Sequence, residues 1–293
     1  MKFAYYPGCS LHATAREYDL STRAVCDRLG IELKELPDWN CCGATSAHST
    51  NHFLSTALPA RNLAIADEMG LEVAVPCAAC YQRLRMAQND LARDPVLREK
   101  MEAVTGRPYK EEGVRVKSLL ELLAGQGEAL KSRVVRPLDG LKVACYYGCL
   151  LLRPPAVSFD DPEHPSSMDG LLEICGAEPI DWGYKTECCG ASLSLTDEDV
   201  VLKLTRDILA VALGAGAECL VVACPLCHSN LDGRQGHVNK KFGTGFQLPV
   251  LYFTQVLGLA MGARPEELGM NIHFVSTDKV FKKCCPENTP RKR

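Results

Sequence analysis

Two hydrophobic patterns alternate along the chain, and each appears twice. Short apolar or aromatic runs at 2–7 and 142–147 have the composition of β-strands, and each leads into a Gly-Cys pair. Stretches at 15–29 and 168–175 carry apolar residues at helical spacing and end at a glycine. Both halves therefore open with a strand followed by a helix.

The two halves continue in parallel. Short strands near 31–36 and 177–181 precede helices at 58–69 and 198–213. The buried-type strands EVAVPC and ECLVVAC then run directly into CxxC motifs, after which helical patterns resume. This order predicts an α/β fold of two pseudo-symmetric Rossmann-like β-α-β halves, with largely parallel sheets and the cysteine motifs at strand-to-helix turns.

The same patterns suggest a division of the chain. We expect a first cysteine-rich domain over 1–138 and a second over 139–275. The remaining segment, 276–293, is basic, contains proline and lacks periodicity, so we expect a flexible tail. Its Cys284-Cys285 pair is not expected to form a third metal site.

Composition limits the class of protein. Of 293 residues, 46% are hydrophobic and 24% charged, as in soluble globular proteins. The net charge of −3 gives no electrostatic reason to expect nucleic acid or an anionic membrane as a partner. The N-terminus lacks the apolar core of a secretory signal, and no run is long enough for a transmembrane segment. We expect a cytoplasmic protein.

Cysteine is the unusual component, with 16 residues. Disulfide frameworks suit small secreted chains, and neither the length nor the N-terminus fits that class. Clustered cysteines in a reducing compartment more often bind metal or perform redox chemistry.

Ten of the cysteines form an internal repeat. Four of them recur 147 positions later: Cys41, Cys42, Cys77 and Cys80 as Cys188, Cys189, Cys224 and Cys227. Cys9 recurs 140 positions later as Cys149, which leaves seven extra residues in the second copy. The Pro- and Asp-rich segment RPPAVSFDDPEHPSS has the composition of a loop insertion at that place. Cys145 aligns with Tyr5, so Cys149 is the partner of Cys9.

The cysteines lie where ligands usually bind in α/β proteins, at the crevice end of a sheet. A CxxC at a helix start places thiolates beside free backbone N–H groups and the positive end of the helix, which lowers the thiol pKa. Gly43 and Gly190 follow the vicinal pairs and allow a tight turn near an inorganic core. Four thiolates suffice for one zinc ion or one ordinary iron–sulfur cube, and each repeat supplies five. Spacing alone leaves iron–sulfur, Cys₄ zinc and an open vicinal dithiol as alternatives.

The repeated motif, at full spacing over 1–90 and 142–232, resembles the CCG cysteine-rich domain family. A chain with two intact copies resembles the B subunit of heterodisulfide reductase. The resemblance implies two noncubane [4Fe-4S] clusters that clamp a small disulfide or thiol substrate and split the disulfide by one-electron steps. One cluster would be bound by Cys9, Cys41, Cys42, Cys77 and Cys80. The other would be bound by Cys149, Cys188, Cys189, Cys224 and Cys227.

The family is broader than one reaction, and two alternatives stay open. Related proteins occur with succinate or fumarate reductases, with glycolate and lactate oxidases and with a sulfur-oxidising heterodisulfide-reductase-like complex. The chain could therefore be an electron-transfer or anchor subunit of a succinate- or glycolate-type dehydrogenase. A non-catalytic module with two zinc sites is the other alternative.

The sequence also lacks the motifs of an independent electron input. It has no CxxCxxCxxxCP run, no GxGxxG after a strand and no P-loop. Electrons must then come from another subunit. The resemblance implies a ferredoxin-like iron–sulfur subunit (C-type) and a flavin-bearing A-type subunit as partners.

Three further polar residues are candidates for chemistry. His48, in GATSAHST, is the candidate catalytic residue, since it could protonate a departing thiolate; the alternative is a polar loop histidine. His228 directly follows a CxxC and is expected at the surface or beside the ligands, with a catalytic role as the alternative. Lys185 is expected to be solvated, with binding of an acidic substrate as the alternative. Three cysteines within helix or strand patterns are expected to be buried hydrophobes: Cys26, Cys175 and Cys219.

Overall fold

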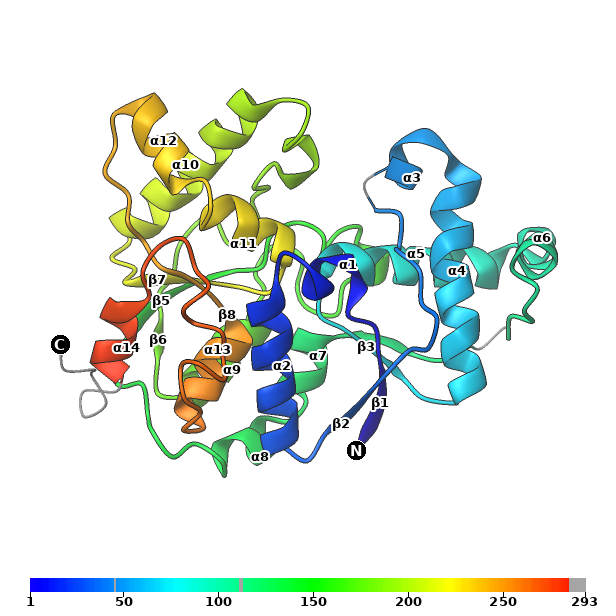
Figure 1. Ribbon diagram of the computed structural model, residues 1–293, viewed down its shortest axis with the longest axis horizontal. Helices are drawn as coiled ribbons and strands as arrows, with labels where there is room; N and C mark the ends of the chain where they lie inside the picture. Colours follow the sequence, from blue (N-terminus) through cyan, green and yellow to red (C-terminus); the bar gives the residue numbers. More distant parts are fainter. Residues whose placement is uncertain (45, 111–112, 285–293) are drawn as a thin grey trace.

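Two parallel four-stranded sheets, one in each half of the chain, form the framework of the protein (Figure 1). The structure is a computed structural model, and it describes residues 1–44, 46–110 and 113–284. The strands of the first sheet are β1 (Lys2–Tyr5), β2 (Glu32–Glu35), β3 (Val73–Val75) and β4 (Val116–Ser118). Those of the second are β5 (Lys142–Tyr146), β6 (Glu178–Pro179), β7 (Cys219–Val222) and β8 (Val250–Tyr252). The predicted α/β class with two pseudo-symmetric halves is confirmed.

Helices connect the strands in both halves. The first half contains α1 (Gly8–His12), α2 (Arg16–Arg28), α3 (Ser46–Thr50), α4 (His52–Met69), α5 (Ala78–Arg93), α6 (Pro95–Thr105), α7 (Leu119–Ala124) and α8 (Gly127–Lys131). The second contains the 3₁₀ turns η1 (Pro155–Val157) and η2 (Ala191–Leu193) and the helices α9 (Ser167–Ile174), α10 (Glu198–Gly214), α11 (Pro225–Leu231), α12 (Gln235–Phe242), α13 (Phe253–Ala260) and α14 (Asp278–Cys284).

Local sequence explains where the long helices start and end. The Asn51 side chain accepts the backbone N–H of Leu54 at the start of α4, and Gly70 ends that helix in the left-handed conformation. The Asp197 side chain caps α10 in the same way, through the N–H of Val200.

The strand order places the cysteine motifs side by side. The sheets have the orders β2-β1-β3-β4 and β6-β5-β7-β8. In the first sheet, β2 therefore lies on one side of β1 and β3 lies on the other. In the second sheet, β6 and β7 lie on opposite sides of β5 in the same way. Parallel strands present their carboxyl ends at one edge, and such a switch in direction opens a crevice there. In each half, the loops and helix starts that follow the first three strands carry all five cysteines.

Helices of the two halves pack against each other across the interface between the halves. Helix α2 of the first half packs against α13 of the second, while α9 of the second half packs against α7 of the first. At the centre, the fully buried ring of Tyr18 stacks on Tyr252, with 4.1 Å between ring centroids and 8° between planes. The inserted loop of the second half also contacts α5 of the first, where the Tyr81 hydroxyl donates to the carbonyl of Val157.

The last segment differs from the prediction of a flexible tail. Residues 278–284 form α14, with Val280 and Cys284 buried one turn apart. This spacing of buried residues is helical, but it is too short to show as periodicity in the sequence. Cys285 and the rest of the tail lie outside the described residues.

Candidate metal centre

The first cysteine set (Cys9, Cys41, Cys42, Cys77 and Cys80) converges from three segments that follow strands. Cys9 lies in α1 just after β1, the vicinal pair follows β2, and the CxxC begins α5 directly after β3. The Sγ atoms of Cys42 and Cys80 are 3.3 Å apart. The backbone N–H of Gly43 donates to the Sγ of Cys41 at 3.5 Å, which orients that thiol.

The second cysteine set (Cys149, Cys188, Cys189, Cys224 and Cys227) repeats this arrangement. The Sγ atoms of Cys189 and Cys227 are 3.6 Å apart, and the N–H of Gly190 donates to the Sγ of Cys188 at 3.3 Å. The thiols of Cys149 and Cys188 also interact directly. Each half therefore brings together the five cysteines that the sequence pattern singled out.

Glycine is required beside both CxxC motifs. Gly8 and Gly148 have φ values of 68° and 66°, in the left-handed region. A Cβ atom on Gly8 would lie 3.0 Å from the Sγ of Cys80, and one on Gly148 would lie 3.2 Å from the Sγ of Cys227. The missing side chains leave room next to the thiols, as a cradle for an inorganic group would need.

A repeated tyrosine ties each vicinal-cysteine loop to its sheet. The hydroxyl of Tyr6 donates to the carbonyl of Asn40 at 2.7 Å, and that of Tyr146 donates to the carbonyl of Glu187 at 2.6 Å. These carbonyls directly precede the CC pairs. Reasoning from the sequence misses this contact, although both tyrosines recur three residues before Cys9 and Cys149.

Hydrogen bonds between thiols give each set anionic character. A hydrogen bond from Cys41, and then one from Cys80, lowers the pKa of Cys42 to about 3, while the pKa of Cys41 is raised. In the second set, the bond with Cys149 lowers the pKa of Cys188 to about 6. Thiolates are the form that binds metal, and each set contains at least one thiol with a lowered pKa.

The opposite pKa shifts of Cys188 and Cys41 predict that these two thiols react at different rates in the protein without clusters. Cys188 and Cys41 are both exposed, but only Cys188 has a lowered pKa. Iodoacetamide at pH 7 is expected to alkylate Cys188 at least about ten times faster than Cys41, as measured by peptide mass spectrometry. In the variant Cys149→Ala, which lacks the bonding partner, the rate at Cys188 should fall about tenfold. Equal alkylation rates at Cys188 in the wild-type and Cys149→Ala proteins would contradict the role of Cys149 in lowering the pKa of Cys188.

The two cysteine sets meet at the interface between the halves. Cys77 and Cys224, the first cysteines of the two CxxC motifs, interact directly and are buried. The buried Tyr18 hydroxyl lies 3.2 Å from the carbonyl of Pro76 and 3.4 Å from that of Ala223, the residues just before these two cysteines. One hydroxyl therefore bridges the two CxxC turns.

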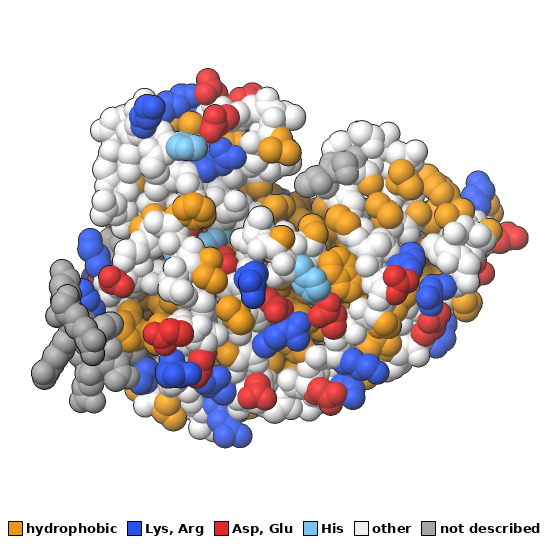
Figure 2. Space-filling view, in the orientation of Figure 1, with side chains coloured by type: hydrophobic (Ala, Val, Ile, Leu, Met, Phe, Trp, Pro, Cys, Tyr) orange, Lys and Arg blue, Asp and Glu red, His pale blue; other side chains and the backbone are white. Residues whose placement is uncertain are grey.

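A cavity of about 250 Å³ opens beside this meeting point. All five cysteines of the second set line it, together with residues at the start of α5 and in α3. Figure 2 shows the surface hollowed between the lobe that carries α10 and α12 and the lobe that carries α3 and α4. The cavity walls come from both halves, so a ligand in it would contact both.

His48 reaches this cavity from α3 and is held there by Arg83. The Nη1 of Arg83 lies 2.7 Å from the Nδ1 of His48, and its Nη2 donates to the Oε1 of Gln82 at 2.7 Å. Because Arg83 can only donate, the Nδ1 of His48 accepts and its proton resides on Nε2. The charge of Arg83 lowers the pKa of His48, so the neutral imidazole dominates at pH 7.

Tertiary contacts determine the environment of the other two polar candidates. His228 is not at the surface but buried beside the ligands, with its Nε2 3.1 Å from the carbonyl of Val250 and 3.0 Å from the Nδ1 of His273. The expectation that Lys185 is solvated is wrong, because Lys185 pairs with Asp169 at 2.7 Å and is largely shielded from solvent. Neighbouring sequence does not reveal these partners.

Three cysteines outside the two sets behave as expected. Cys26, Cys175 and Cys219 are buried in the hydrophobic core. Cys145 lies on β5 and is likewise buried, so it does not replace Cys149.

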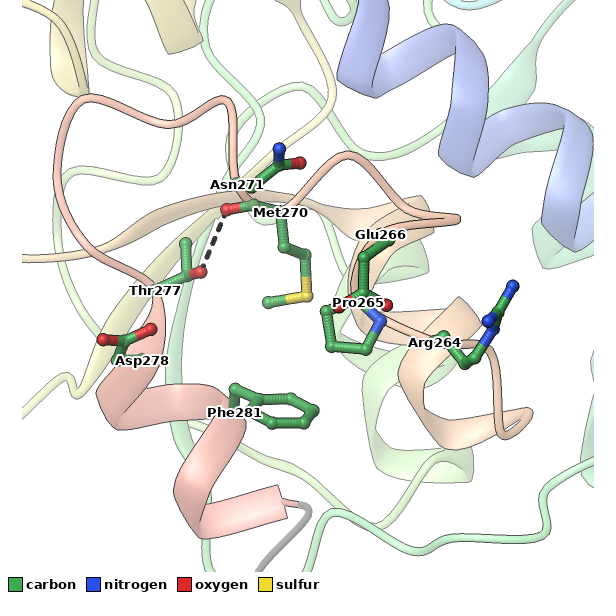
Figure 3. Close-up of a pocket in the computed structure, with 8 residues that line it drawn as sticks. All are labelled: Arg264, Pro265, Glu266, Met270, Asn271, Thr277, Asp278 and Phe281. Carbon is green, nitrogen blue, oxygen red and sulfur yellow. Dashed lines mark hydrogen bonds between the residues drawn. The ribbon is translucent and has the colours of Figure 1, made fainter. Parts of the chain in front are cut away.

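A second cavity, of about 390 Å³, lies beside α14 (Figure 3). Figure 3 shows Met270 and Phe281 lining it, with Arg264 at its edge. Its lining contains neither cysteine nor histidine among the described residues. Although it is larger, it brings no thiol or imidazole together, and the cysteine cavity remains the candidate site.

The donor sets fit iron–sulfur clusters. Cys77 and Cys224 occupy the N-cap positions of α5 and α11, where free backbone N–H groups and the helix dipole favour anionic sulfur. Five converging thiols per site exceed the four ligands of a closed zinc site, and the glycine gaps beside the sulfurs leave space for an inorganic core.

The chain belongs to the cysteine-rich (CCG) domain family, whose sequence pattern matches residues 3–85 and 143–232. It carries two copies of this iron–sulfur domain. A 35% identical protein is the 8-methylmenaquinol:fumarate reductase membrane anchor subunit of Wolinella succinogenes, with 95% of this chain and 99% of that protein aligned. A 34% identical protein is the B subunit of the ferredoxin/F(420)H(2)-dependent CoB-CoM heterodisulfide reductase of Methanosarcina acetivorans, with 96% and 97% aligned.

A more distant relative, 29% identical over 97% of this chain and 98% of its own length, is a heterodisulfide reductase B-subunit-like protein of Archaeoglobus profundus. Among solved structures, a hypothetical protein from Helicobacter pylori matches with a TM-score of 0.75 and 14% identity, covering 94% of this chain and 52% of that one. That likeness shows the fold alone. Among the helices that the structure describes, none has both the length and the hydrophobicity of a transmembrane span.

Proposed function

We propose that this chain is the disulfide-handling iron–sulfur subunit of a heterodisulfide-reductase-like complex. One observation carries the proposal: the two five-cysteine sets meet through Cys77 and Cys224 beside a cavity that both halves line. The relatives named as B subunits of heterodisulfide reductase align over nearly the whole chain. Each set would hold one noncubane [4Fe-4S] cluster through its five cysteines.

The overall reaction requires two electrons and two protons. A disulfide R–S–S–R′ breaks its S–S bond, takes up both electrons and yields RSH and R′SH. The two clusters, when bound, would supply these electrons one at a time. The chain would hold the disulfide in the cavity, where Ala79, Leu150 and Leu226 provide apolar contacts that displace water.

His48 is the residue we propose to assist sulfur departure. Its neutral state makes it a poor proton donor, so we favour a hydrogen bond from Nε2–H to the departing thiolate over a full proton transfer. Both protons would then come from water at the cavity mouth.

Replacement of His48 is expected to slow disulfide cleavage without affecting cluster content. Loss of one hydrogen bond to an anion should lower kcat for His48→Ala about tenfold. His237→Ala, which removes an exposed histidine on α12, is the matched control and should retain wild-type turnover. Unchanged kcat in His48→Ala with full iron content would contradict this role.

Partners and location follow from the same proposal. Electrons would come from a ferredoxin-like iron–sulfur subunit, itself supplied by a flavin-bearing subunit. We propose a cytoplasmic location, because reactive thiol sites of this kind persist in a reducing compartment.

A second candidate function is favoured by a specific comparison. The Wolinella succinogenes relative is a membrane anchor subunit of a fumarate reductase, and it aligns over 99% of its length. On this alternative, the clusters would pass electrons between a quinol and a flavoprotein, and the cavity would bind no disulfide.

A stoichiometric cleavage assay separates the two candidates. The cluster-loaded chain, reduced anaerobically with dithionite and freed of excess reductant, is mixed with a panel of small symmetrical and mixed disulfides. Our proposal predicts one mole of disulfide cleaved, and two moles of thiol released, per two electrons lost from the clusters. Fully loaded protein that remains reduced with every disulfide would overturn the proposal and favour the electron-transfer subunit.

A further inference from the structure

The two cysteine sites carry different charges although their cysteines repeat. Three residues after each CxxC, the first half has Arg83 and the second has Asn230. Directly before each CC pair, the first half has Asn40 and the second has Glu187. Both differences place more positive charge at the first site.

Arg83 is the positive charge that the first site gains. It lies on α5 one helical turn after Cys80, so the two side chains share a helix face. The Sγ of Cys80 in turn lies 3.3 Å from that of Cys42. The half-buried guanidinium bonds to His48 and Gln82, which are both neutral.

The charge of Arg83 therefore stays available to the thiolates. It contributes to the lowered pKa of Cys42. The carboxylate of Asp90, two turns further along α5, also acts on the guanidinium.

The corresponding position of the second site is neutral. Asn230 donates through Nδ2 to the carbonyl of Cys189 at 3.0 Å. Two cations of the second half stand near, but each has a carboxylate partner: Lys185 pairs with Asp169 at 2.7 Å, and Arg234 pairs with Glu198 at 3.1 Å. Arg83 also lines the cavity beside the second-set cysteines, but the thiol on which its charge acts is Cys42 of the first set.

Glu187 adds a negative charge to the second site. It is exposed and directly precedes Cys188, whose pKa its charge raises in part. The backbone carbonyl of Glu187 accepts a hydrogen bond from the hydroxyl of Tyr146, as the carbonyl of Asn40 does from Tyr6 in the first half. The two loops therefore hold the carboxylate and the amide in equivalent backbone positions.

These charges affect the reduction of a bound cluster. Reduction adds one negative charge, which a nearby cation stabilises and a nearby anion destabilises. Net charge around a cluster is one of the factors that set its reduction potential. Solvent exposure acts in the same direction, because Cys9 is exposed whereas its counterpart Cys149 is only partly so.

We propose that Arg83 and Glu187 fix the order in which the two clusters are reduced, with the first-half cluster reduced at the higher potential. This inference rests on the proposed function, since it requires a cluster in both sites. The first site would then store one electron until the second cluster, whose cysteines line the cavity, is also reduced. Arg83 acts here as a tuning residue, through its charge rather than through contact with the substrate.

The test is a potentiometric titration of the anaerobically reconstituted chain, followed by electron paramagnetic resonance. The variant Cys42→Ser, which lacks a ligand of the first set, assigns the two signals. At a fixed potential, Arg83→Gln should lower the reduced-to-oxidised ratio of the first cluster about tenfold, which corresponds to about 59 mV for one electron. Arg83→Lys keeps the charge and should stay close to wild type.

Glu187→Gln should raise the potential of the second cluster, by less than Arg83→Gln lowers the first, because solvent screens an exposed charge. The inference is overturned if fully loaded wild-type protein shows equal potentials or the reverse order, or if Arg83→Gln shifts neither signal. Iron analysis of the same samples keeps the outcomes apart, because a wild-type chain with only one cluster, or none, contradicts the proposed function instead.

Discussion

Replacement of Cys42 by serine is expected to remove one of two clusters and to abolish disulfide cleavage. Cys42 is buried, lies 3.3 Å from Cys80 and is strongly anionic, with a pKa of about 3. Serine has the same shape but is a poor ligand for iron. The iron content of the anaerobically reconstituted chain should fall from about eight to about four per chain.

The symmetry of the protein supplies the controls. Cys189→Ser removes the equivalent ligand of the second set and should have the same effect on iron. Cys26→Ser changes a buried cysteine of α2 outside both sets and should keep about eight irons. Circular dichroism checks that each variant is folded. Full iron content in Cys42→Ser would show that Cys42 is not a ligand.

Tyr18→Ala is expected to have the largest effect on stability. The ring is fully buried between the halves, stacks on Tyr252 and meets Phe253 edge-on, with 6.3 Å between centroids. Truncation of a large buried aromatic side chain costs about 3–5 kcal/mol, through lost contacts and the cavity that remains. The urea midpoint of the anaerobically purified protein, followed by circular dichroism, should fall accordingly.

Two variants separate packing from hydrogen bonding. Tyr18→Phe keeps the ring and loses only the hydroxyl shared by the carbonyls of Pro76 and Ala223, so it should cost about 1 kcal/mol. Leu20→Ala, on the exposed side of the same helix, should change the free energy of unfolding by less than about 0.5 kcal/mol. An equal loss in all three variants would contradict the central role of the stacked ring.

Much of the fold could be predicted because the information lies in local pattern. The strands before Cys9, Cys77, Cys149 and Cys224 are short, apolar and bounded by turns, and parallel pairing then follows from the alternation with helices. The start of α4 at His52 could not be identified from periodicity, because the signal for it is a single cap residue, Asn51.

The packing of helices across the interface between the halves could not be predicted from the sequence. The packing of α2 on α13 and of α9 on α7 depends on how two separate sheets face each other. Residues 114–125 and 248–260, which include β4, α7, β8 and α13, carry no cysteine, so the repeated motif does not mark them. Pseudo-symmetry places these elements, since each pair occupies the same position in its half.

The candidate site, like the fold, could be predicted only in part. Ten cysteines at repeated spacing could be identified from the sequence, whereas the side chains around them could not. The bond between His48 and Arg83 joins residues 35 positions apart, and the Tyr18 bridge to Ala223 joins residues 205 positions apart. Such contacts are determined by tertiary packing, and they decide protonation and charge at the site.

The most direct test of the account is metal and sulfide analysis of the anaerobically reconstituted chain, combined with electron paramagnetic resonance. Two five-cysteine sites that meet at Cys77 and Cys224 predict about eight irons and eight sulfides per chain, with two signals that broaden each other because the clusters are neighbours. A colourless protein with about two zinc ions per chain, or a single cluster of about four irons, would contradict it.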